Sequence, residues 1–192
     1  ATKRYKQAEK LFKKVENEAK YRYDASYYLG YIAYQLEDYD AAVENFNKVT
    51  TEDGDTTVGY FQADMNFKLG RFDKAIALAR KSFANANENQ TSELSKIIGE
   101  SYFNLKDYRS ALPYLEVYKG KRGKWSNTDF YQLGYTHYRL GEYEKAIMQF
   151  NKIISGANAV AQNAYYHLAD CYLKTNKKTQ ALNAFKSASA FK

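Results

Sequence analysis

The sequence contains almost no residues that interrupt a helix. Its 192 residues include one proline and ten glycines, and these two residue types are the least favourable in a helix interior. We therefore expect helices along the whole chain. The length corresponds to about one domain, which would cover residues 1–192.

Two other scarcities narrow the class of protein. Cys171 is the single cysteine, so no disulfide can form within the chain and cysteine usage says nothing about the redox compartment. No run of eighteen apolar residues exists, and the N-terminus shows no apolar signal segment, so we expect no direct membrane insertion. The chain opens on Ala1 rather than methionine, which fits a fragment whose targeting signal lies upstream.

Positive charge is in excess, but it forms no continuous basic stretch. The chain holds 29 Lys and Arg against 22 Asp and Glu. Residues 1–22 carry a net charge of +5, residues 23–55 carry −7, and each later segment lies between 0 and +4. This alternation of sign disfavours a nucleic-acid surface that runs along the whole chain.

Internal repetition is what the sequence has in abundance. An alanine recurs every 33 to 36 residues, and a second column of Gly or Ala lies 12 residues before the next alanine. The first column is Ala8, Ala42, Ala75, Ala111, Ala146 and Ala181, and the second is Gly30, Ala63, Gly99, Gly134 and Ala169. A fixed period of about 35 residues indicates a repeat architecture. Its units are 1–22 (partial), 23–55, 56–91, 92–126, 127–161 and 162–192.

Each unit has the periodicity of two helices joined by a turn. Apolar side chains recur at helical spacing, and the two small columns predict positions where the helices of a pair cross closely. Asp38, Asp73 and Asp107 lie near the expected starts of second helices, where a carboxylate can accept from free backbone amides. Turn-forming residues separate the units, as in KGKRGKWSN at 119–127.

These columns resemble the tetratricopeptide repeat, whose units combine a small residue in the first helix with an aromatic turn residue and an alanine in the second. The matching residues are Leu29, Gly30, Tyr39, Ala42 and Phe46 in one unit, and Leu133, Gly134, Tyr143, Ala146 and Phe150 in another. The resemblance implies an all-α fold, a right-handed superhelix or solenoid of tandem helical hairpins. It covers five repeats and a partial one. The proline that often closes a unit is absent, and Gly54 or Asn158 stands instead.

The phase of the repeat suggests that the array continues beyond both ends. Tyr5, Ala8 and Phe12 match a second helix that no first helix precedes, and the end around Phe185 and Phe191 has no polar cap. We therefore expect a segment of a longer bacterial protein of this kind. Association into oligomers through such uncapped ends is compatible with the same pattern.

The densest aromatic stretch is YQLGYTHYRLGEY, residues 131–143. In the repeat phase, His137 and Tyr143 belong to packing columns. Tyr131, Tyr135 and Tyr138 instead share the first-helix face that, in proteins similar to this one, lines a concave groove. The same columns extend this set, which we call the aromatic rail: Tyr27, Tyr31, Tyr34, Tyr60, Phe67, Phe103, Tyr131, Tyr135, Tyr138 and Tyr166. The rail either fills gaps between helices or contacts a partner protein or peptide.

Charged residues of both signs accompany the rail, which favours a partner of mixed charge. They are Asp64, Lys68, Lys96, Glu100, Arg139, Asp170 and Lys174. Some proteins of this family bind acidic chaperone tails through a basic clamp that contains asparagine. Here Lys96 is followed one turn later by Glu100, which disfavours that client class.

We find no pattern typical of catalysis, of a metal site or of a cofactor site. His167 and Cys171 are four residues apart, as zinc ligands on a helix would be, but a buried cysteine beside a packed histidine explains the pair. Asp53 and Asp55 fall in an expected solvated turn. The glycines of KGKRGKW lack the spacing of a phosphate-binding loop, and this basic turn is expected to be solvated.

The sequence therefore predicts a non-catalytic scaffold that binds a partner peptide or helix in an aromatic-lined concave groove. Two alternatives stay open. One is a helical-repeat RNA or nucleic-acid binder, because pentatricopeptide repeats share the 35-residue hairpin. The other is a rigid spacer segment of a larger multi-domain protein. Analogy with envelope-associated bacterial proteins favours the periplasm or cell envelope, with the cytoplasm as the alternative.

Overall fold

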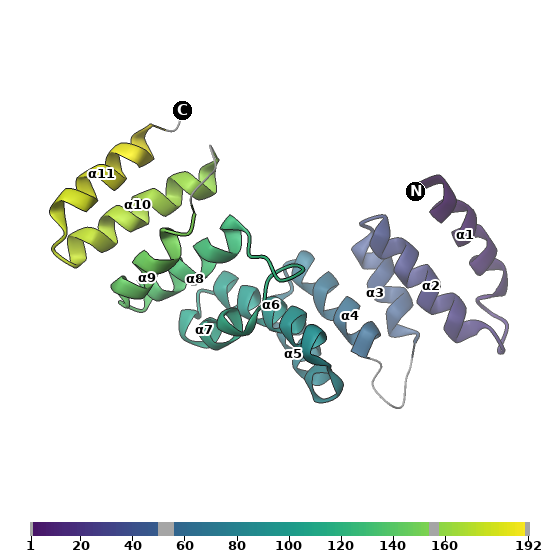
Figure 1. Cartoon of the computed structure of the whole chain (residues 1–192). Helices are drawn as coiled ribbons and strands as arrows, with labels where there is room; N and C mark the ends of the chain where they lie inside the picture. Colours follow the sequence, from purple (N-terminus) through teal and green to yellow (C-terminus); the bar gives the residue numbers. More distant parts are fainter. Residues whose placement is uncertain (1, 50–55, 154–157, 191–192) are drawn as a thin grey trace. The chain divides into compact units, whose positions relative to one another are not determined.

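The chain is all-α over the residues that the computed structural model describes, which are 2–49, 56–153 and 158–190 (Figure 1). Asp53, Gly54, Asp55 and Phe191 lie outside these residues. The helices are α1 (Thr2–Val15), α2 (Arg22–Gln35), α3 (Tyr39–Asn47), α4 (Thr56–Lys68), α5 (Phe72–Ser82), α6 (Glu88–Asn104), α7 (Tyr108–Val117), α8 (Asn127–Arg139), α9 (Tyr143–Phe150), α10 (Ala159–Lys174) and α11 (Lys178–Ser189), with a short 3₁₀ turn η1 (Phe83–Asn85). In the described part, none of these helices is long and apolar enough to cross a bilayer.

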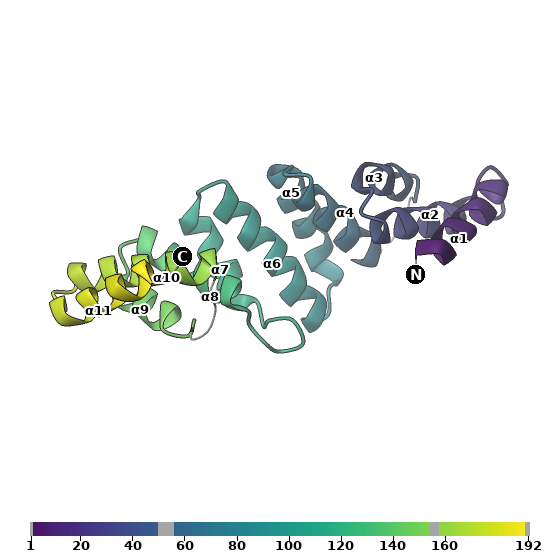
Figure 2. The same cartoon turned by 90° about the horizontal axis from the view of Figure 1, so that it is seen from above.

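Two compact units divide the chain, one over residues 1–101 and the other over residues 102–192. In the first, α2 pairs with α3 and α4 pairs with α5, while α1 packs on α2 and α3 packs on α4. In the second, α8 pairs with α9 and α10 pairs with α11, while α7 packs on α8 and α9 packs on α10. Both views show these antiparallel hairpins (Figures 1 and 2). The predicted helical-repeat fold is confirmed.

The turn within each hairpin has the same backbone geometry. The residue before the N-cap of the second helix has a positive φ, which is 71° at Gly70 and 78° at Gly141. The equivalent residues of other units adopt it without being glycine: φ is 62° at Glu37, 64° at Lys106 and 60° at Asn176. Left-handed geometry of this kind stops a helix and reverses the chain.

Carboxylates cap two of the second helices, as the sequence predicts. The side chain of Asp38 accepts a hydrogen bond from the backbone amide of Ala41 at 3.2 Å. Asp107 accepts from the amide of Ser110 at 3.1 Å, and hydrogen bonds from the side chain and the amide of Ser110 lower the pKa of the Asp107 carboxyl. Asp73 lies one residue inside α5, in its first turn, where its charge favours the helix dipole without capping it.

The small column marks close crossings of paired helices. A Cβ added at Gly30 would lie 3.0 Å from the ring of Phe46, and one at Gly134 would lie 2.9 Å from the ring of Phe150. Each glycine therefore makes room for the large aromatic residue of the second helix in its own hairpin. Ala42, Ala75, Ala111 and Ala146 of the other column are fully buried.

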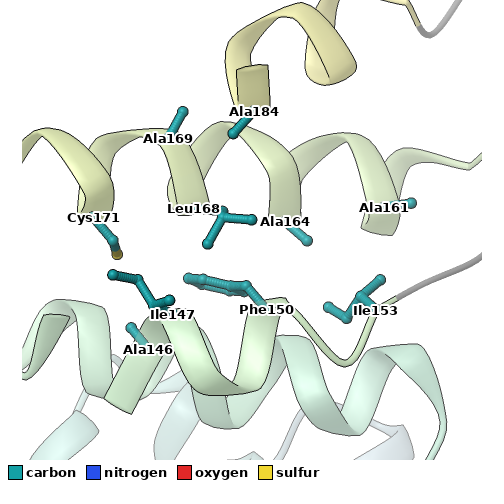
Figure 3. Packing of buried hydrophobic residues seen from close by; sticks show 10 residues of the cluster. All are labelled: Ala146, Ile147, Phe150, Ile153, Ala161, Ala164, Leu168, Ala169, Cys171 and Ala184. Carbon is teal, nitrogen blue, oxygen red and sulfur yellow. The ribbon is translucent and has the colours of Figure 1, made fainter. Parts of the chain in front are cut away.

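The best-defined core lies between α9 and α10 (Figure 3). Ile147 and Phe150 of α9 point toward Leu168 and Cys171 of α10. Ala169 and Ala184 extend the cluster where α10 approaches α11. Where the second helix of one repeat packs on the first helix of the next, as α9 does on α10, neighbouring repeats share a core.

Candidate functional site

The C-terminal unit gathers five rail residues into one aromatic cluster. Ring centroids lie 5.8 Å apart for Tyr131 and Tyr135, for Tyr135 and Tyr138, and for Phe103 and Tyr135. Tyr166 of α10 joins through His167, whose ring centroid lies 5.4 Å from it and 4.9 Å from Tyr135. These separations are typical of aromatic pairs that attract one another.

Hydroxyl hydrogen bonds fix the cluster across repeats. The Tyr138 hydroxyl on α8 donates to the carboxylate of Asp170 on α10 at 2.8 Å. This hydrogen bond, together with burial, raises the pKa of Tyr138 to about 12. Burial also raises the pKa of Tyr131 to about 12. Both hydroxyls are therefore protonated and uncharged at neutral pH.

Five further rail residues lie in the N-terminal unit, where Phe61 forms a centre that the sequence analysis did not single out. Its ring centroid lies 4.9 Å from Tyr34, 5.9 Å from Tyr31 and 5.7 Å from Tyr60. The column of Phe61 also contains His167, and both residues stand at the middle of their aromatic clusters. The remaining two rail residues contact other rings: Tyr27 lies against Phe46 and Phe67 against Phe72.

In the N-terminal unit, the charged groups beside Tyr34 offset each other. The Tyr34 hydroxyl donates to Asp64 at 2.6 Å, and Lys68 lies 3.0 Å from the same carboxylate. Burial and the hydrogen bond to Asp64 raise the pKa of Tyr34 to about 12. The Lys68 ammonium also lies 4.5 Å from the ring centre of Tyr34. This arrangement joins α2 to α4 and leaves no net charge among its ionised groups.

Of the ten rail residues, nine are only partly exposed and Tyr166 is 55% exposed. Much of the ring area therefore fills the space between helices, which is the first of the two interpretations drawn from the sequence. The exposed remainder of these side chains, which is largest at Tyr166, faces solvent. Use of the rail as a binding surface stays a prediction.

The two histidines and the cysteine are packed among other side chains of the fold. His137 is buried, and its Nδ1 lies 2.7 Å from Glu142, which confirms its assignment to packing. Cys171 is fully buried in the α9–α10 core, and this burial raises the pKa of its thiol to about 12. Burial lowers the pKa of His167, whose Nδ1 has no hydrogen-bond partner among the described residues. Within those residues, no group of three or more His, Cys, Asp or Glu is placed to hold a metal.

The turn at 119–127 is more structured than a solvated loop. Trp125 donates from its indole nitrogen to the backbone carbonyl of Tyr118 at 3.0 Å, and its ring contacts Phe130. Tyr118 is buried, and a positive φ of 85° at Gly120 starts the reversal of the chain. Solvation is confirmed for the exposed basic side chains of Lys121 and Arg122, but it does not extend to Trp125.

A cleft between α1, α2 and α3 was not predicted from the sequence. Its volume is about 520 Å³. Leu29 and Ile32 of α2 contribute apolar lining together with Leu36, which caps that helix, while Glu9 of α1 and Glu16, which follows α1, contribute charge. No rail residue lines it, because it opens between helices on the other side of α2.

Family models match both parts of the chain. A model described as tetratricopeptide repeat matches residues 1–55. A second, described as anaphase-promoting complex, cyclosome, subunit 3, matches residues 108–188.

Two curated proteins are similar in sequence. The TPR repeat-containing protein MJ1428 of Methanocaldococcus jannaschii is 31% identical over 129 residues, which are 66% of this chain and 22% of that protein. Response regulator aspartate phosphatase E of Bacillus subtilis is 25% identical over 200 residues, covering 91% of this chain and 52% of that protein. The chain thus spans about half the length of these relatives or less.

Solved structures of the same fold include MamA and YrrB. A MamA structure (AMB-1) superposes with a TM-score of 0.75 at 22% identity, covering 89% of this chain and 99% of that one. YrrB, described as a TPR protein with an unusual peptide-binding site, gives a TM-score of 0.75 at 18% identity, covering 92% of this chain and 90% of that one. At these identities the likeness shows the fold.

Proposed function

We propose that this chain, which belongs to the tetratricopeptide-repeat family, is a non-catalytic scaffold that binds a segment of another protein on the first-helix faces of its repeats. The binding residues are those of the aromatic rail. The fold itself supplies a reason. Stacked first helices present side chains at regular intervals, so an extended or helical segment can contact several repeats at once.

The single observation that carries the proposal is the immobilised aromatic cluster beside the exposed Tyr166. Ring contacts and the hydrogen bond from Tyr138 to Asp170 hold the neighbouring tyrosines before any partner arrives. A partner therefore meets a surface that loses little conformational entropy on binding. Tyrosine is also a residue type that often dominates the energy of interfaces. The peptide-binding site named for YrrB supports the same use of this fold.

Nucleic-acid binding has weaker support than protein binding. The first-helix faces carry carboxylates as well as cations: Asp64 and Asp170 lie among the rail tyrosines and accept their hydrogen bonds. Phosphate groups would meet these carboxylates at close range. A helical-repeat RNA binder needs stacking bases and a basic path, and the second of these is interrupted in both units.

A capture experiment with two matched variants tests the proposal. The wild-type chain, Tyr166→Ser and Leu182→Ser are immobilised and exposed to a lysate of the source cells. Tyr166 on α10 and Leu182 on α11 are each 55% exposed, so the two changes remove comparable apolar surface from a first and a second helix. Circular dichroism confirms that each variant is folded.

We expect a protein that the wild type and Leu182→Ser retain and that Tyr166→Ser retains much less. Equal retention by all three, or retention of nothing, would contradict the proposal and leave a rigid spacer as the better account of this chain.

A further inference from the structure

Arg139 is a cation of the C-terminal unit that contacts two rail-side tyrosines and forms no ion pair with a described carboxylate. It ends α8, and its guanidinium lies 4.7 Å from the ring centre of Tyr108 and 5.9 Å from that of Tyr135. Its Nη1 donates to the hydroxyls of the same tyrosines at 3.4 and 3.3 Å. Both contacts are neutral and long, and no carboxylate among the described residues pairs with it.

The equivalent position in the N-terminal unit shows the contrast. Lys68 occupies the same repeat position, and Asp64 neutralises it at 3.0 Å. Four residues before Arg139, where the repeat of Lys68 has Asp64, the C-terminal unit has Tyr135, which is neutral. Lys174, one repeat after Arg139, also forms no ion pair within the described part of the chain.

The C-terminal unit also has the more positive net charge of the two. Residues 102–192 hold 14 Lys and Arg against 6 Asp and Glu, a net charge of +8, whereas residues 1–101 hold 15 against 16. The C-terminal unit therefore attracts negative groups over distances comparable with the Debye length. Arg139 lies beside the rail cluster of that unit, because Tyr135 contacts both its guanidinium and the rings of Phe103, Tyr131 and Tyr138.

We propose that Arg139, held between the rings of Tyr108 and Tyr135, anchors an acidic side chain of the protein segment that binds the rail. This inference rests on the proposed function and names the partner's chemistry: an Asp or Glu flanked by apolar residues. A guanidinium pairs with a carboxylate through two parallel hydrogen bonds. The two tyrosine rings flank the guanidinium and limit its motion, so less side-chain freedom is lost when the carboxylate arrives.

The geometry favours a carboxylate within a chain over one at its end or over a phosphate. Rail residues occupy both neighbouring repeats, Phe103 before α8 and Tyr166 after it, so a bound segment continues past Arg139 in both directions. A phosphate carries nearly two charges and three acceptor oxygens. The single guanidinium and two neutral hydroxyls at this position match a group with one charge.

A library of random dodecapeptides displayed on phage is the probe for this proposal. The whole 192-residue chain selects peptides at low ionic strength, and the enriched sequences are synthesised with amidated C-termini for anisotropy measurements. Arg139→Gln is compared with Lys186→Gln, which removes one charge from α11 in the same unit. Any difference between these variants therefore reports the position of the charge and not the total charge.

We expect the enriched peptides to contain Asp or Glu beside apolar residues. Arg139→Gln should weaken them about tenfold, the loss of one charge-assisted pair, and Lys186→Gln about twofold or less. Arg139→Glu should bind again when the peptide's acidic residue is changed to lysine.

Other outcomes overturn the proposal in distinguishable ways. Peptides that Tyr166→Ser weakens but that show no acidic preference would refute the Arg139 anchor and keep the proposed function. Peptides indifferent to Tyr166→Ser, or no selected peptides, would refute both. A peptide that gains affinity from a free C-terminus and not from an acidic side chain would refute the side-chain assignment. Arg139-dependent binding of a twenty-nucleotide oligo-dT, without peptide binding, would assign the residue to nucleic acid.

Discussion

At the scale of single residues, the hydroxyl of Tyr138 shows that a rail side chain can pack between helices and also hydrogen-bond to the next repeat. Tyr138 fills space between α8 and α10, and its hydroxyl donates to Asp170 of the next repeat. Tyr34 and Asp64 repeat the arrangement in the N-terminal unit. The sequence predicted the column of each tyrosine and of each carboxylate. It did not predict that they pair across repeats, because the reach from one helix to the next depends on the packing distance, which spacing along the chain does not give.

Removal of the Tyr138 hydroxyl should change the response of stability to alkaline pH. In the folded state the pKa of this group is about 12, whereas the unfolded chain loses the proton near pH 10. The contribution is therefore fully present below pH 10 and is lost as pH rises from about 10 to 12. We expect Tyr138→Phe to lose less stability than the wild type over this range in urea unfolding at several pH values. Equal slopes would contradict the assignment. Asp170→Asn, which removes the opposing charge, should also reduce the slope.

Phe150 supports the largest prediction for a single side chain. Its ring is 2% exposed, lies against Gly134 in its own hairpin, and packs with Leu168 of the next repeat. Phe150→Ala should lower the free energy of unfolding by about 3–5 kcal/mol, because it removes buried apolar area and leaves a cavity. Met148→Ala, two residues away and 62% exposed, is the control and should change it by about 0.5 kcal/mol or less. Similar losses in urea unfolding would show that the core is not where the structure places it.

At the scale of helices, the repeat pattern was sufficient to predict which helices pair. The alanine and glycine columns predicted the pairing of helices, and Gly30 and Gly134 lie where a side chain would collide with Phe46 and Phe150. The left-handed residue of each turn was missed. Its column contains Glu37 and Lys106 as well as Gly70 and Gly141, and no shared residue type marks it. The packed Trp125 was missed for a related reason, since glycines and lysines around it are typical of an exposed turn.

Lys106 offers a test at this scale. Its φ of 64° is unfavourable for a residue with a Cβ. Lys106→Gly should remove that strain at some cost in unfolded-chain entropy, and we expect a net gain of up to about 1 kcal/mol in denaturant unfolding. The reverse change at the equivalent position, Gly141→Lys, should destabilise by a similar amount. A loss of stability in Lys106→Gly would show that the turn geometry differs from the one described.

At the scale of the whole molecule, the two units use the same kind of rail with different charge. The N-terminal unit pairs Lys68, beside the rail, with a carboxylate, whereas Arg139 in the C-terminal unit has none among the described residues. The repeat count and the all-α fold followed from the sequence, because both depend on local periodicity. The exposure of each rail ring did not follow, because neighbouring repeats decide it: Tyr166 is exposed while Tyr131, in the same column, is half covered by Tyr135 and by His167.

Site-specific photo-cross-linking tests the central claim most directly, since it reports contact without removing a side chain that packs. In three separate variants, a benzophenone amino acid replaces Tyr166 on α10, Leu182 on α11 or Met148 on α9. The three positions are similarly exposed. The chain is then irradiated in the source cells. We predict a covalent adduct with a partner protein from position 166 and little or none from positions 182 and 148. Adducts mainly from the second-helix positions, or from none of the three, would contradict the claim that this chain binds its partner on the first-helix faces.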